Sequence, residues 1–465
     1  MGLESAESLY GLPDGAVVCL RTITPLGVPL YMSTVGDSVA THGVGTYATL
    51  RPHRQDWEAF RVRLFDDGTA ALQNAGGGYL SPENKDAKRW TFRAHCPAGG
   101  WERLTLTPTR PAHGEISNTY PSHFSITTRI NGETLILSRG DTATDSGADT
   151  EVVITTTAQH QGGQYDSPCN QWEVILCALP VVNFMAFGGV PALSAELAHV
   201  RCVVELTGKA QEFVWVILRA MLEIGAFYVV GHGVADDLFA SIQTKTGRLP
   251  YKDDAEAEDG SFKVNTSLLE RRSGHYTVGT ADGIACGNRE MWDAMVRGTF
   301  AATETVADTL LHALAHGQEI VTGSPAPWRS KWADKDHYIG FRCLVYHPGP
   351  LRKANDHPVV TTARHTDATW VTVLRNDSVG GLAVKPPAFG EWLNIPPVEG
   401  ALLVNTGNVM ATATAGLLAA GTKPLFGAVC HYVERVSSTA TRVSMPFFYD
   451  RNGGASYDGG GTGGC

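Results

Sequence analysis

The stretch ARHTDATWVTVL, residues 363–374, carries the strongest indication of fold in the second half of the chain. It sets His365 two positions before Asp367 and continues into alternating β-branched residues, a pattern typical of a strand. Because residues two apart in a strand point to the same face, an imidazole and a carboxylate can be directed at one point. A similar spacing between His113 and Glu115 arises by chance, so residues elsewhere must complete a site.

A metal site around this pair needs a third ligand from a distant part of the chain. Iron(II) is commonly held on one face by two histidines and one carboxylate, which leaves other positions open for a co-substrate and dioxygen. The candidate is His431 in GAVCHYVERV, which follows an apolar segment and a turn-rich stretch and so can return on another strand of the same barrel. The residues themselves thus make His365, Asp367 and His431 candidate metal ligands and candidate catalytic residues.

A pair suited to a carboxylate follows His431. In TRVSMPFFY, residues 441–449, period two puts the guanidinium of Arg442 and the hydroxyl of Ser444 on one face. The planar fork of arginine binds a carboxylate through two parallel charge-assisted hydrogen bonds, and the serine can add a third donor. Since Arg271 also begins an Arg-x-Ser triplet, the order and spacing of all these motifs supply the specificity.

Composition limits the classes of function. A length of 465 residues, with 43% hydrophobic and 18% charged residues, predicts a folded protein of two or three domains. A net charge of -10 without a run of basic residues argues against nucleic acids and anionic membranes as partners. Without a signal-peptide pattern or a long apolar stretch, we expect a cytoplasmic protein whose nine scattered cysteines are reduced thiols.

The first half of the chain, residues 10–177, is predicted to be all β. Short strand-like runs such as VVCLRTI, FRVRLF and EVVITTT are separated by turn residues and show little helical periodicity. The dipeptide Trp-Glu opens a strand three times, at Trp57, Trp101 and Trp172, which indicates internal duplication. Three such units predict a closed β structure with threefold symmetry.

DWEAFRVRL together with GTAALQNAGGGYLSPENKD resembles the pattern of fascin-like β-trefoil domains. The residues that match are Trp57, Glu58, Phe60, Leu72 and Tyr79. This resemblance implies fold more than activity. It makes a glycan or a protein such as actin a candidate ligand, and a module that only packs against its neighbour is the alternative.

The second half, residues 179–450, begins where helical periodicity appears. AQEFVWVILRAMLEIG carries an apolar stripe and stops at a glycine, as an amphipathic helix does. A second helix is expected from about residue 288 to 316, so residues 179–335 form a mostly helical lead-in to strands over residues 336–450. The glycine-rich tail, residues 451–465, is expected to be disordered.

In this order the motifs resemble those of the iron(II)/2-oxoglutarate-dependent dioxygenases of the isopenicillin N synthase-like group. LPVVNF at 179–184 looks like the family's opening iPvIDl, and EIGAFYVVGHGV at 223–234 is close to its eiGFFyvvnHGv. Downstream, HTDATWVTVL, GGLAV, IPPVEGALLVNTGN, His431 and RVSMPFFYD keep the family's order. The resemblance spans about residues 179–450 and implies a double-stranded β-helix, a jelly-roll barrel, with flanking helices.

This resemblance also implies roles for residues. By it, His365, Asp367 and His431 hold iron(II), while Arg442 and Ser444 bind the distal carboxylate of 2-oxoglutarate. Dioxygen is then the other co-substrate, and ascorbate is a candidate reductant. Because an aspartate stands where halogenating relatives have a small residue, the expected reaction is hydroxylation, desaturation or oxidative cyclisation of a small-molecule metabolite.

Departures from the family pattern concern the same site. CLVYHPGP, residues 343–350, stands where users of 2-oxoglutarate often read NYYP, with an asparagine and a tyrosine that help to bind the co-substrate. Aligned on the proline, this chain keeps Tyr346 as a candidate co-substrate ligand. Asn408 replaces a usual aspartate and Tyr432 a usual arginine. The segment between them is longer than usual, so the strand that bears His431 is expected to be displaced or to leave an enlarged loop.

Two alternatives stay open. Isopenicillin N synthase and aminocyclopropane carboxylate oxidase keep Arg-x-Ser without using 2-oxoglutarate, so the first alternative is an iron oxidase of the same fold that does not need this co-substrate. The second is a glycan- or actin-binding trefoil protein whose barrel is a non-catalytic scaffold. The sequence predicts neither the identity of the substrate nor the oligomeric state.

Overall fold

A computed structural model divides the chain into two compact units, Met1–Pro180 and Val181–Cys465. The tail at 451–465 lies outside the described residues, as do Trp57 and Trp101 of the predicted repeat. The structure describes residues 8–23, 29–33, 48–51, 59–82, 90–93, 102–109, 123–130, 133–138, 150–151, 153–156, 171–206, 208–246, 263–272, 275–279, 289–329, 338–353, 355–386, 390–417 and 423–450.

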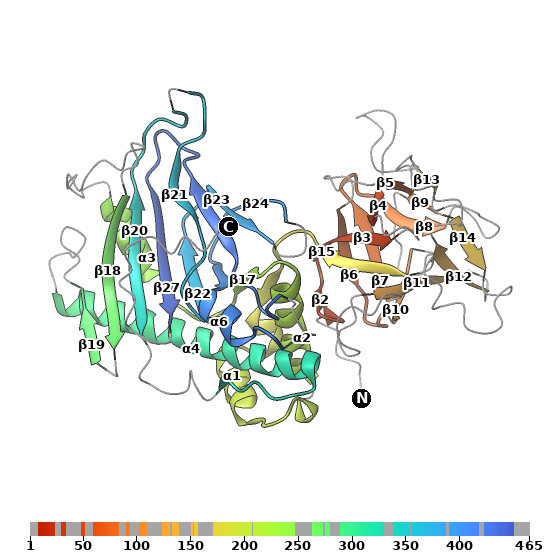
Figure 1. The fold of residues 1–465 in the computed structure, drawn as a ribbon, viewed down its shortest axis with the longest axis horizontal. Coiled ribbons are helices and arrows are strands. Elements are labelled where there is room, and N and C mark those ends of the chain that lie inside the picture. The colour runs from red at the N-terminus through yellow and green to blue at the C-terminus, as the bar shows by residue number, and fades with distance from the viewer. Residues whose placement is uncertain are drawn as a thin grey trace. The chain divides into compact units, whose positions relative to one another are not determined.

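The first unit consists of antiparallel strands in its described residues (Figure 1). Two short strands pair with each other, and the remaining thirteen join one sheet. The strands are β1 (Ser8–Leu9), β2 (Leu12–Pro13), β3 (Val17–Ile23), β4 (Pro29–Ser33), β5 (Thr49–Arg51), β6 (Phe60–Leu64), β7 (Ala70–Asn74), β8 (Tyr79–Pro82), β9 (Trp90–Arg93), β10 (Thr105–Pro108), β11 (His123–Ile130), β12 (Glu133–Ser138), β13 (Thr150–Glu151), β14 (Val153–Thr156) and β15 (Trp172–Leu176). The all-β character of this half is confirmed for these residues, whereas the trefoil arrangement stays a prediction.

Trp172 shows why a Trp-Glu dipeptide opens a strand in this unit. Its ring is fully buried, and its indole N–H donates to the carbonyl of Leu137 at 2.9 Å. The next residue, Glu173, faces the other side of the strand and pairs with Arg21 on the neighbouring strand β3. The tryptophan therefore anchors β15 in the core, while the glutamate ties it to β3.

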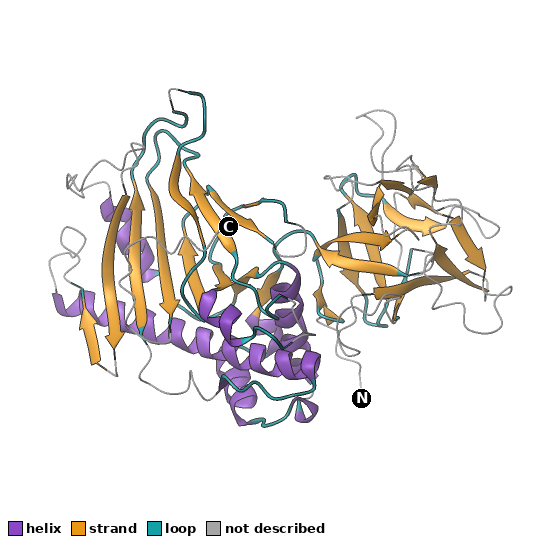
Figure 2. Cartoon of the chain, viewed as in Figure 1, coloured by secondary structure: helices purple, strands orange, loops and turns teal. Residues whose placement is uncertain are grey.

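The described residues of the second unit form two sheets (Figure 2). The larger has the order β16-β17-β25-β22-β27-β20-β18-β19 and the smaller the order β21-β26-β23-β24. From β20 onward the chain repeatedly crosses between the two sheets and returns in antiparallel pairs, which is the connectivity of a jelly roll. The predicted double-stranded β-helix is therefore confirmed.

The strands of this unit are β16 (Val181–Asn183), β17 (Ala226–Val230), β18 (Lys263–Arg272), β19 (His275–Val278), β20 (Ile339–Tyr346), β21 (Val360–His365), β22 (Val371–Asn376), β23 (Leu382–Lys385), β24 (Leu393–Ile395), β25 (Leu402–Thr406), β26 (Cys430–Glu434) and β27 (Arg442–Tyr449). Its helices are η6 (Phe184–Phe187), α1 (Val190–His199), η7 (Val203–Glu205), α2 (Gly208–Glu223), α3 (Asp237–Thr246), α4 (Arg289–Thr322) and α6 (Asn408–Ala413).

The long helix α4 supports the larger sheet (Figure 1). It packs against β18, β22 and β27, and Phe300 on α4 meets Phe447 on β27 with ring centroids 5.0 Å apart. Both predicted helices are present, although α4 continues past the expected end at His316 because buried apolar residues extend to Val321. Within the described ranges, no helix is long and apolar enough to cross a membrane.

The described residues of the lead-in to the barrel are mostly helical, but they also include strands. Strands β18 and β19 lie within it and extend the larger sheet. β18 pairs with β20 from Lys263, opposite Tyr346, to Arg271, opposite Ile339. This pairing satisfies the backbone groups that β20 would otherwise expose at the edge of the barrel.

Of the five cysteines that the structure describes, four follow the sequence-based expectation. Cys19, Cys177, Cys202 and Cys343 are reduced and form no disulfide. Cys430, at the start of β26, is disulfide-bonded. The expectation of reduced thiols throughout is therefore wrong at this position.

Candidate metal centre

Two strands of the smaller sheet bring the candidate metal ligands together. Antiparallel pairing of β21 with β26 sets His365 opposite His431, and their ring centroids lie 4.2 Å apart. Asp367 lies two residues beyond the end of β21 and is buried. In the part of the chain that the structure describes, these three residues form the one cluster of histidine, cysteine or acidic side chains that could hold a metal ion.

The spacing of the donor atoms fits a metal ion. The Nε2 atoms of His365 and His431 lie 3.8 Å and 3.7 Å from Oδ1 of Asp367, which is too far for hydrogen bonds. All three donor atoms lie within 4.8 Å of one another. Two atoms that are each about 2.1 Å from one ion can be up to about 4.2 Å apart, so an ion can join either nitrogen to this oxygen.

Backbone contacts determine which ring nitrogen of each histidine faces the cluster. Nδ1 of His365 lies 2.8 Å from the carbonyl oxygen of Ala363, and Nδ1 of His431 lies 3.0 Å from that of Val429. Because a carbonyl can only accept, each Nδ1 carries the proton in the neutral imidazole. Each Nε2 then presents a lone pair to Asp367, as a metal-binding histidine requires.

The two oxygens of the Asp367 carboxylate have different surroundings. Oδ2 accepts from the Thr372 hydroxyl at 2.7 Å and from the Asn405 amide at 3.0 Å, while Oδ1 faces the two histidines. Burial by itself raises the pKa of Asp367, but the imidazoles of His431 and His365 and these two hydrogen bonds outweigh it, and the pKa lies below its usual value. The carboxylate is therefore ionised at neutral pH and able to bind a cation.

The loop that carries Asp367 is held by the start of helix α6. The backbone N–H of Asn408 donates to the carbonyl of Asp367 at 2.7 Å. The Asn408 side chain also bonds to the hydroxyl of Thr366, between the two predicted ligands. A Cβ atom added to Gly407 would lie 2.6 Å from the same Asp367 carbonyl, so this close approach requires glycine. The departure at Asn408 is thus accommodated, because the amide anchors the turn.

The guanidinium of Arg442 on β27 is buried, and no carboxylate among the described residues lies within ion-pair distance of it. Its nitrogens donate to three neutral oxygens: Nε to the carbonyl of Gly380 at 2.8 Å, Nη2 to Oδ1 of Asn376 at 2.8 Å and Nη1 to Oγ of Ser444 at 3.2 Å. A guanidinium has five N–H groups, so it can still donate to a further acceptor. The Asp377 carboxylate attracts this guanidinium only from beyond ion-pair distance, so an anionic ligand in direct contact would complement the buried cation.

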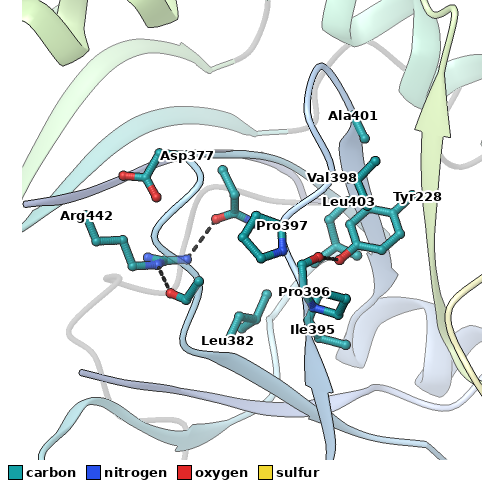
Figure 3. Close-up of a pocket in the computed structure, with 12 residues that line it drawn as sticks. Tyr228, Asp377, Leu382, Ile395, Pro396, Pro397, Val398, Ala401, Leu403 and Arg442 are labelled. Atoms are coloured by element: carbon teal, nitrogen blue, oxygen red, sulfur yellow. Dashed lines mark hydrogen bonds between the residues drawn. The ribbon is translucent and has the colours of Figure 1, made fainter. Parts of the chain in front are cut away.

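Figure 3 shows a pocket that adjoins Arg442. Arg442 and Asp377 lie on one side of it, and Pro397 and Tyr228 lie on the other. The Asp377 carboxylate accepts from backbone N–H groups, including that of Val443. It attracts the Arg442 guanidinium without reaching ion-pair distance. The lining of this pocket includes none of the three metal-ligand candidates. The pocket thus lies beside the predicted carboxylate anchor and not at the metal cluster.

Tyr346 on β20 is the cross-strand partner of Arg442. Its ring centroid lies 4.8 Å from the guanidinium carbon, which is the geometry of a cation–π contact. Its hydroxyl lies 3.2 Å from Oγ1 of Thr362, on the strand that ends at His365. The structure therefore brings the three predicted co-substrate residues, Arg442, Ser444 and Tyr346, into one cluster.

The second departure, Tyr432, belongs to an aromatic group beside the cluster. Its ring meets that of Trp392 edge to face, with centroids 4.7 Å apart. The guanidinium of Arg364 lies 5.1 Å from the Trp392 ring and 5.8 Å from that of Tyr432. Tyr432 and Arg364 each adjoin a predicted metal ligand in sequence, so this packing helps to hold strands β21 and β26 together.

Residues 339–451 match the 2OG-Fe(II) oxygenase superfamily. The match runs from the start of β20 to just past β27, and it includes every predicted metal and co-substrate residue. This part of the chain is a 2OG-Fe(II) oxygenase domain. The iron(II) and 2-oxoglutarate in the family's description agree with the His-Asp-His cluster and the buried arginine.

Curated relatives of the oxygenase domain are matched over part of their length. The chain is 28% identical over 148 residues to a 2-oxoglutarate-dependent dioxygenase from Didymella fabae, covering 32% of this chain and 40% of the relative. It is 35% identical over 111 residues to a 2-oxoglutarate-Fe(II) type oxidoreductase from Aspergillus fumigatus, covering 24% of this chain and 30% of the relative. The chain thus spans less than half the length of these relatives. The solved structure of a rice dioxygenase for auxin oxidation aligns with 59% of this chain and 84% of its own, at 22% identity and a TM-score of 0.39.

Sequence reasoning missed three polar residues of the oxygenase domain that contact the predicted site. Thr372 and Asn405 bond to Asp367, and Asn376 bonds to Arg442. The signal was a polar side chain within an otherwise apolar strand, as in VTVLRN and LLVNT. Such residues are buried only where a partner satisfies them.

Proposed function

We propose that the protein is a non-haem iron(II)- and 2-oxoglutarate-dependent dioxygenase that oxidises a small-molecule metabolite by hydroxylation, desaturation or oxidative cyclisation. The observation that carries this proposal is the convergence of two Nε2 atoms and one carboxylate oxygen on a single point. The similarity to proteins named 2-oxoglutarate-dependent dioxygenases supports it.

In this proposal, His365, Asp367 and His431 hold the iron. When bound there, ferrous iron with 2-oxoglutarate would supply the electrons needed to activate dioxygen. The backbone carbonyls at Nδ1 keep both imidazoles in the tautomer that offers Nε2. The protein thereby supplies two neutral donors and one negative charge from fixed positions.

Arg442 and Ser444 would bind the distal carboxylate of the co-substrate. The guanidinium donates in its plane, and the Ser444 oxygen accepts from Arg442, which leaves the serine hydroxyl hydrogen for the ligand. Tyr346 restrains the guanidinium by covering its face. Burial of all three side chains excludes water and strengthens charge-assisted bonds to the ligand.

The test is an anaerobic titration of the iron(II)-loaded protein with 2-oxoglutarate. We expect the visible charge-transfer absorption of the chelate to appear and saturate. Succinate release is then measured with iron(II), ascorbate, 2-oxoglutarate and dioxygen. Asp367→Ala should abolish both signals, because it removes the one anionic ligand. Asp237→Ala, which removes an exposed carboxylate at the start of α3, is the control and should retain both.

The possible results separate the candidate activities. Undiminished absorption and succinate release in Asp367→Ala would contradict the ligand assignment. Iron binding without the chelate absorption, together with dioxygen consumption that does not require 2-oxoglutarate, would instead indicate an iron oxidase of the same fold. Absence of iron binding to the natural protein would reject both and leave a non-catalytic barrel.

A further inference from the structure

The Asp367 carboxylate is held by a buried network of side chains behind the predicted metal position. Thr372 on β22 and Asn405 on β25 are cross-strand partners on adjacent strands of the larger sheet. The Thr372 hydroxyl and the Asn405 amide both donate to Oδ2 of Asp367, at 2.7 Å and 3.0 Å. Two neighbouring strands therefore deliver two donors to the same oxygen, on the side away from the histidines.

The hydrogen bonds of this network can run in one direction only. An ionised carboxylate accepts and does not donate, so the single hydroxyl hydrogen of Thr372 goes to Asp367. The contact of 3.0 Å between the Thr369 and Thr372 hydroxyls must then have Thr369 as its donor. Thr369, Thr372 and Asn405 are 0%, 3% and 6% exposed, so water does not compete for these groups.

The orientation of the carboxylate decides how many positions on a metal ion it occupies. A freely rotating carboxylate can bind a cation through one oxygen or through both. Two hydrogen bonds to Oδ2 oppose rotation of the group and make binding through Oδ2 unfavourable. Binding through Oδ1 alone occupies one position on the ion and leaves others for the co-substrate and dioxygen.

We infer that Thr372 and Asn405 are positioning residues that hold Oδ2 of Asp367 and so reserve Oδ1 for the metal ion. This inference rests on the proposed function, because it concerns the same metal ion. The two residues contact the carboxylate and not the ion, and they act by fixing the ligand's orientation. Neighbours of this kind typically change metal affinity by about 10- to 100-fold when they are replaced.

The experiment uses the full chain and the metal ion alone, with no co-substrate. Dissociation constants for iron(II) and cobalt(II) are measured under anaerobic conditions by competition with a chromophoric chelator. The d–d absorption spectrum of the cobalt(II) protein reports the coordination number. Thr372→Val and Asn405→Leu each remove one donor while keeping a side chain of similar size. Thr372→Ser keeps the hydroxyl.

The control is another buried threonine hydroxyl in the same unit. Thr303 on α4 is 4% exposed and donates to the carbonyl of Thr299 at 2.8 Å. Thr303→Val makes the same chemical change as Thr372→Val without contacting Asp367. A comparison of the two variants at matched melting temperature therefore separates carboxylate positioning from a general loss of packing.

The inference predicts that Thr372→Val and Asn405→Leu each raise the dissociation constant for both metals by about 10- to 100-fold and change the cobalt(II) spectrum. Thr372→Ser and Thr303→Val should match the natural protein in both measurements. If Thr372→Val and Asn405→Leu also match it, the inference is overturned while the proposed function stands. If the natural protein binds neither metal, the proposed function fails, and the inference falls with it. Because the two donors are removed separately, a variant that does not fold leaves the other as the test.

Discussion

At the scale of single residues, the candidate site contains two buried charged groups, the Asp367 carboxylate and the Arg442 guanidinium. Neither forms a close ion pair with an oppositely charged side chain among the described residues. The Asp367 carboxylate faces two imidazoles at distances too long for hydrogen bonds, and the Arg442 guanidinium donates to neutral oxygens. Each charge has been taken out of water, which is unfavourable unless a ligand compensates it. A cation at Asp367 and an anion at Arg442 would provide that compensation.

Arg442→Lys tests the anchor for the co-substrate. A lysine keeps the charge but loses the planar fork, so we expect the dissociation constant for 2-oxoglutarate to rise about a hundredfold, on the order of 3 kcal/mol. The measurement is the 2-oxoglutarate concentration at half-maximal charge-transfer absorption. Arg352→Lys, at an exposed position, is the control. Unchanged 2-oxoglutarate affinity in Arg442→Lys would place the anchor elsewhere.

Gly407→Ala tests the turn that holds Asp367. A methyl group there would lie 2.5 Å from Oγ1 of Thr369 and 2.6 Å from the Asp367 carbonyl, so the loop must move. We expect a loss of about 1–3 kcal/mol in unfolding free energy and weaker iron(II) binding, measured by urea denaturation and by chelator competition. Gly298→Ala in α4 is the control, because nothing lies within 4 Å of the added methyl group. Equal iron affinity in the two variants would show that the turn does not position the ligand.

The sequence was enough to predict the candidate ligand residues, but not the residues that form hydrogen bonds to them. His365, Asp367 and Arg442 stand in motifs where period two alone puts the functional groups on one face. Thr372 and Asn405 act through a register between β22 and β25, strands that are separated in sequence by β23 and β24. Single-strand periodicity cannot give a register between strands, so these contacts could not be predicted.

At the scale of elements, the interface between α4 and the larger sheet contains a second polar cluster. The Tyr449 hydroxyl on β27 donates to Asp308 on α4 at 2.7 Å. Arg271 on β18 pairs with Glu304, one helical turn before Asp308. Burial raises the pKa of Asp308 to about 6, although the hydrogen bond from Tyr449 opposes the shift. This carboxyl group therefore changes charge near neutrality within a packed interface.

Asp308→Asn should change how stability depends on pH. The carboxyl group loses its proton near pH 4 in the unfolded chain and near pH 6 in the folded one, so the folded state binds more protons between these values. Stability of the natural protein therefore falls as the pH rises from 4 to 6, by up to roughly 3 kcal/mol from this group. The amide of the variant keeps an acceptor for Tyr449 without titrating, so this part of the fall should disappear.

The measurement for Asp308→Asn is the urea midpoint at several pH values between about 4.5 and 7.5, a window that spans the folded-state pKa. The variant should gain stability relative to the natural protein as the pH rises through this window. Asp356→Asn, at an exposed loop position, is the matched control. A stability difference between Asp308→Asn and the natural protein that is constant with pH would show that Asp308 does not titrate in this range.

The elements themselves were predictable to different degrees. The apolar stripe of α2 and the order of motifs along β20–β27 were enough to predict a helix and a jelly roll. β18 was not predicted, because KVNTSLLERR becomes a strand through its pairing with β20 and lacks strict alternation of its own. Propensity is a weak guide wherever a neighbouring edge strand offers backbone partners.

At the scale of the whole molecule, the chain divides at Pro180 into a first unit, whose described residues form antiparallel strands, and a second unit. The second unit contains the residues that match the oxygenase superfamily and is here called the oxygenase unit. The predicted metal and co-substrate residues all lie in the second unit. A glycan or protein ligand for the first unit, its trefoil symmetry and a cytoplasmic location stay predictions. A ligand that binds the second unit should therefore stabilise that unit selectively.

Calorimetry of the full chain tests this division. Iron(II) at about 100 times its dissociation constant should stabilise the oxygenase unit by about 2.7 kcal/mol and raise the melting temperature of one transition only. Asp367→Ala should show no such shift. If iron moved every transition of the natural protein equally, the two units would unfold as one, and the division into independent units would be wrong.

The imidazoles of the oxygenase unit have a further property that follows from their backbone contacts. Each ring is tethered to the carbonyl two residues earlier in its own segment, Ala363 for His365 and Val429 for His431. Rotation of both rings is thus restricted before any ion arrives, so capture of iron need not freeze them and sacrifices little side-chain entropy. A metal ion can then bind to and dissociate from a preformed site, and the strands around it need not refold.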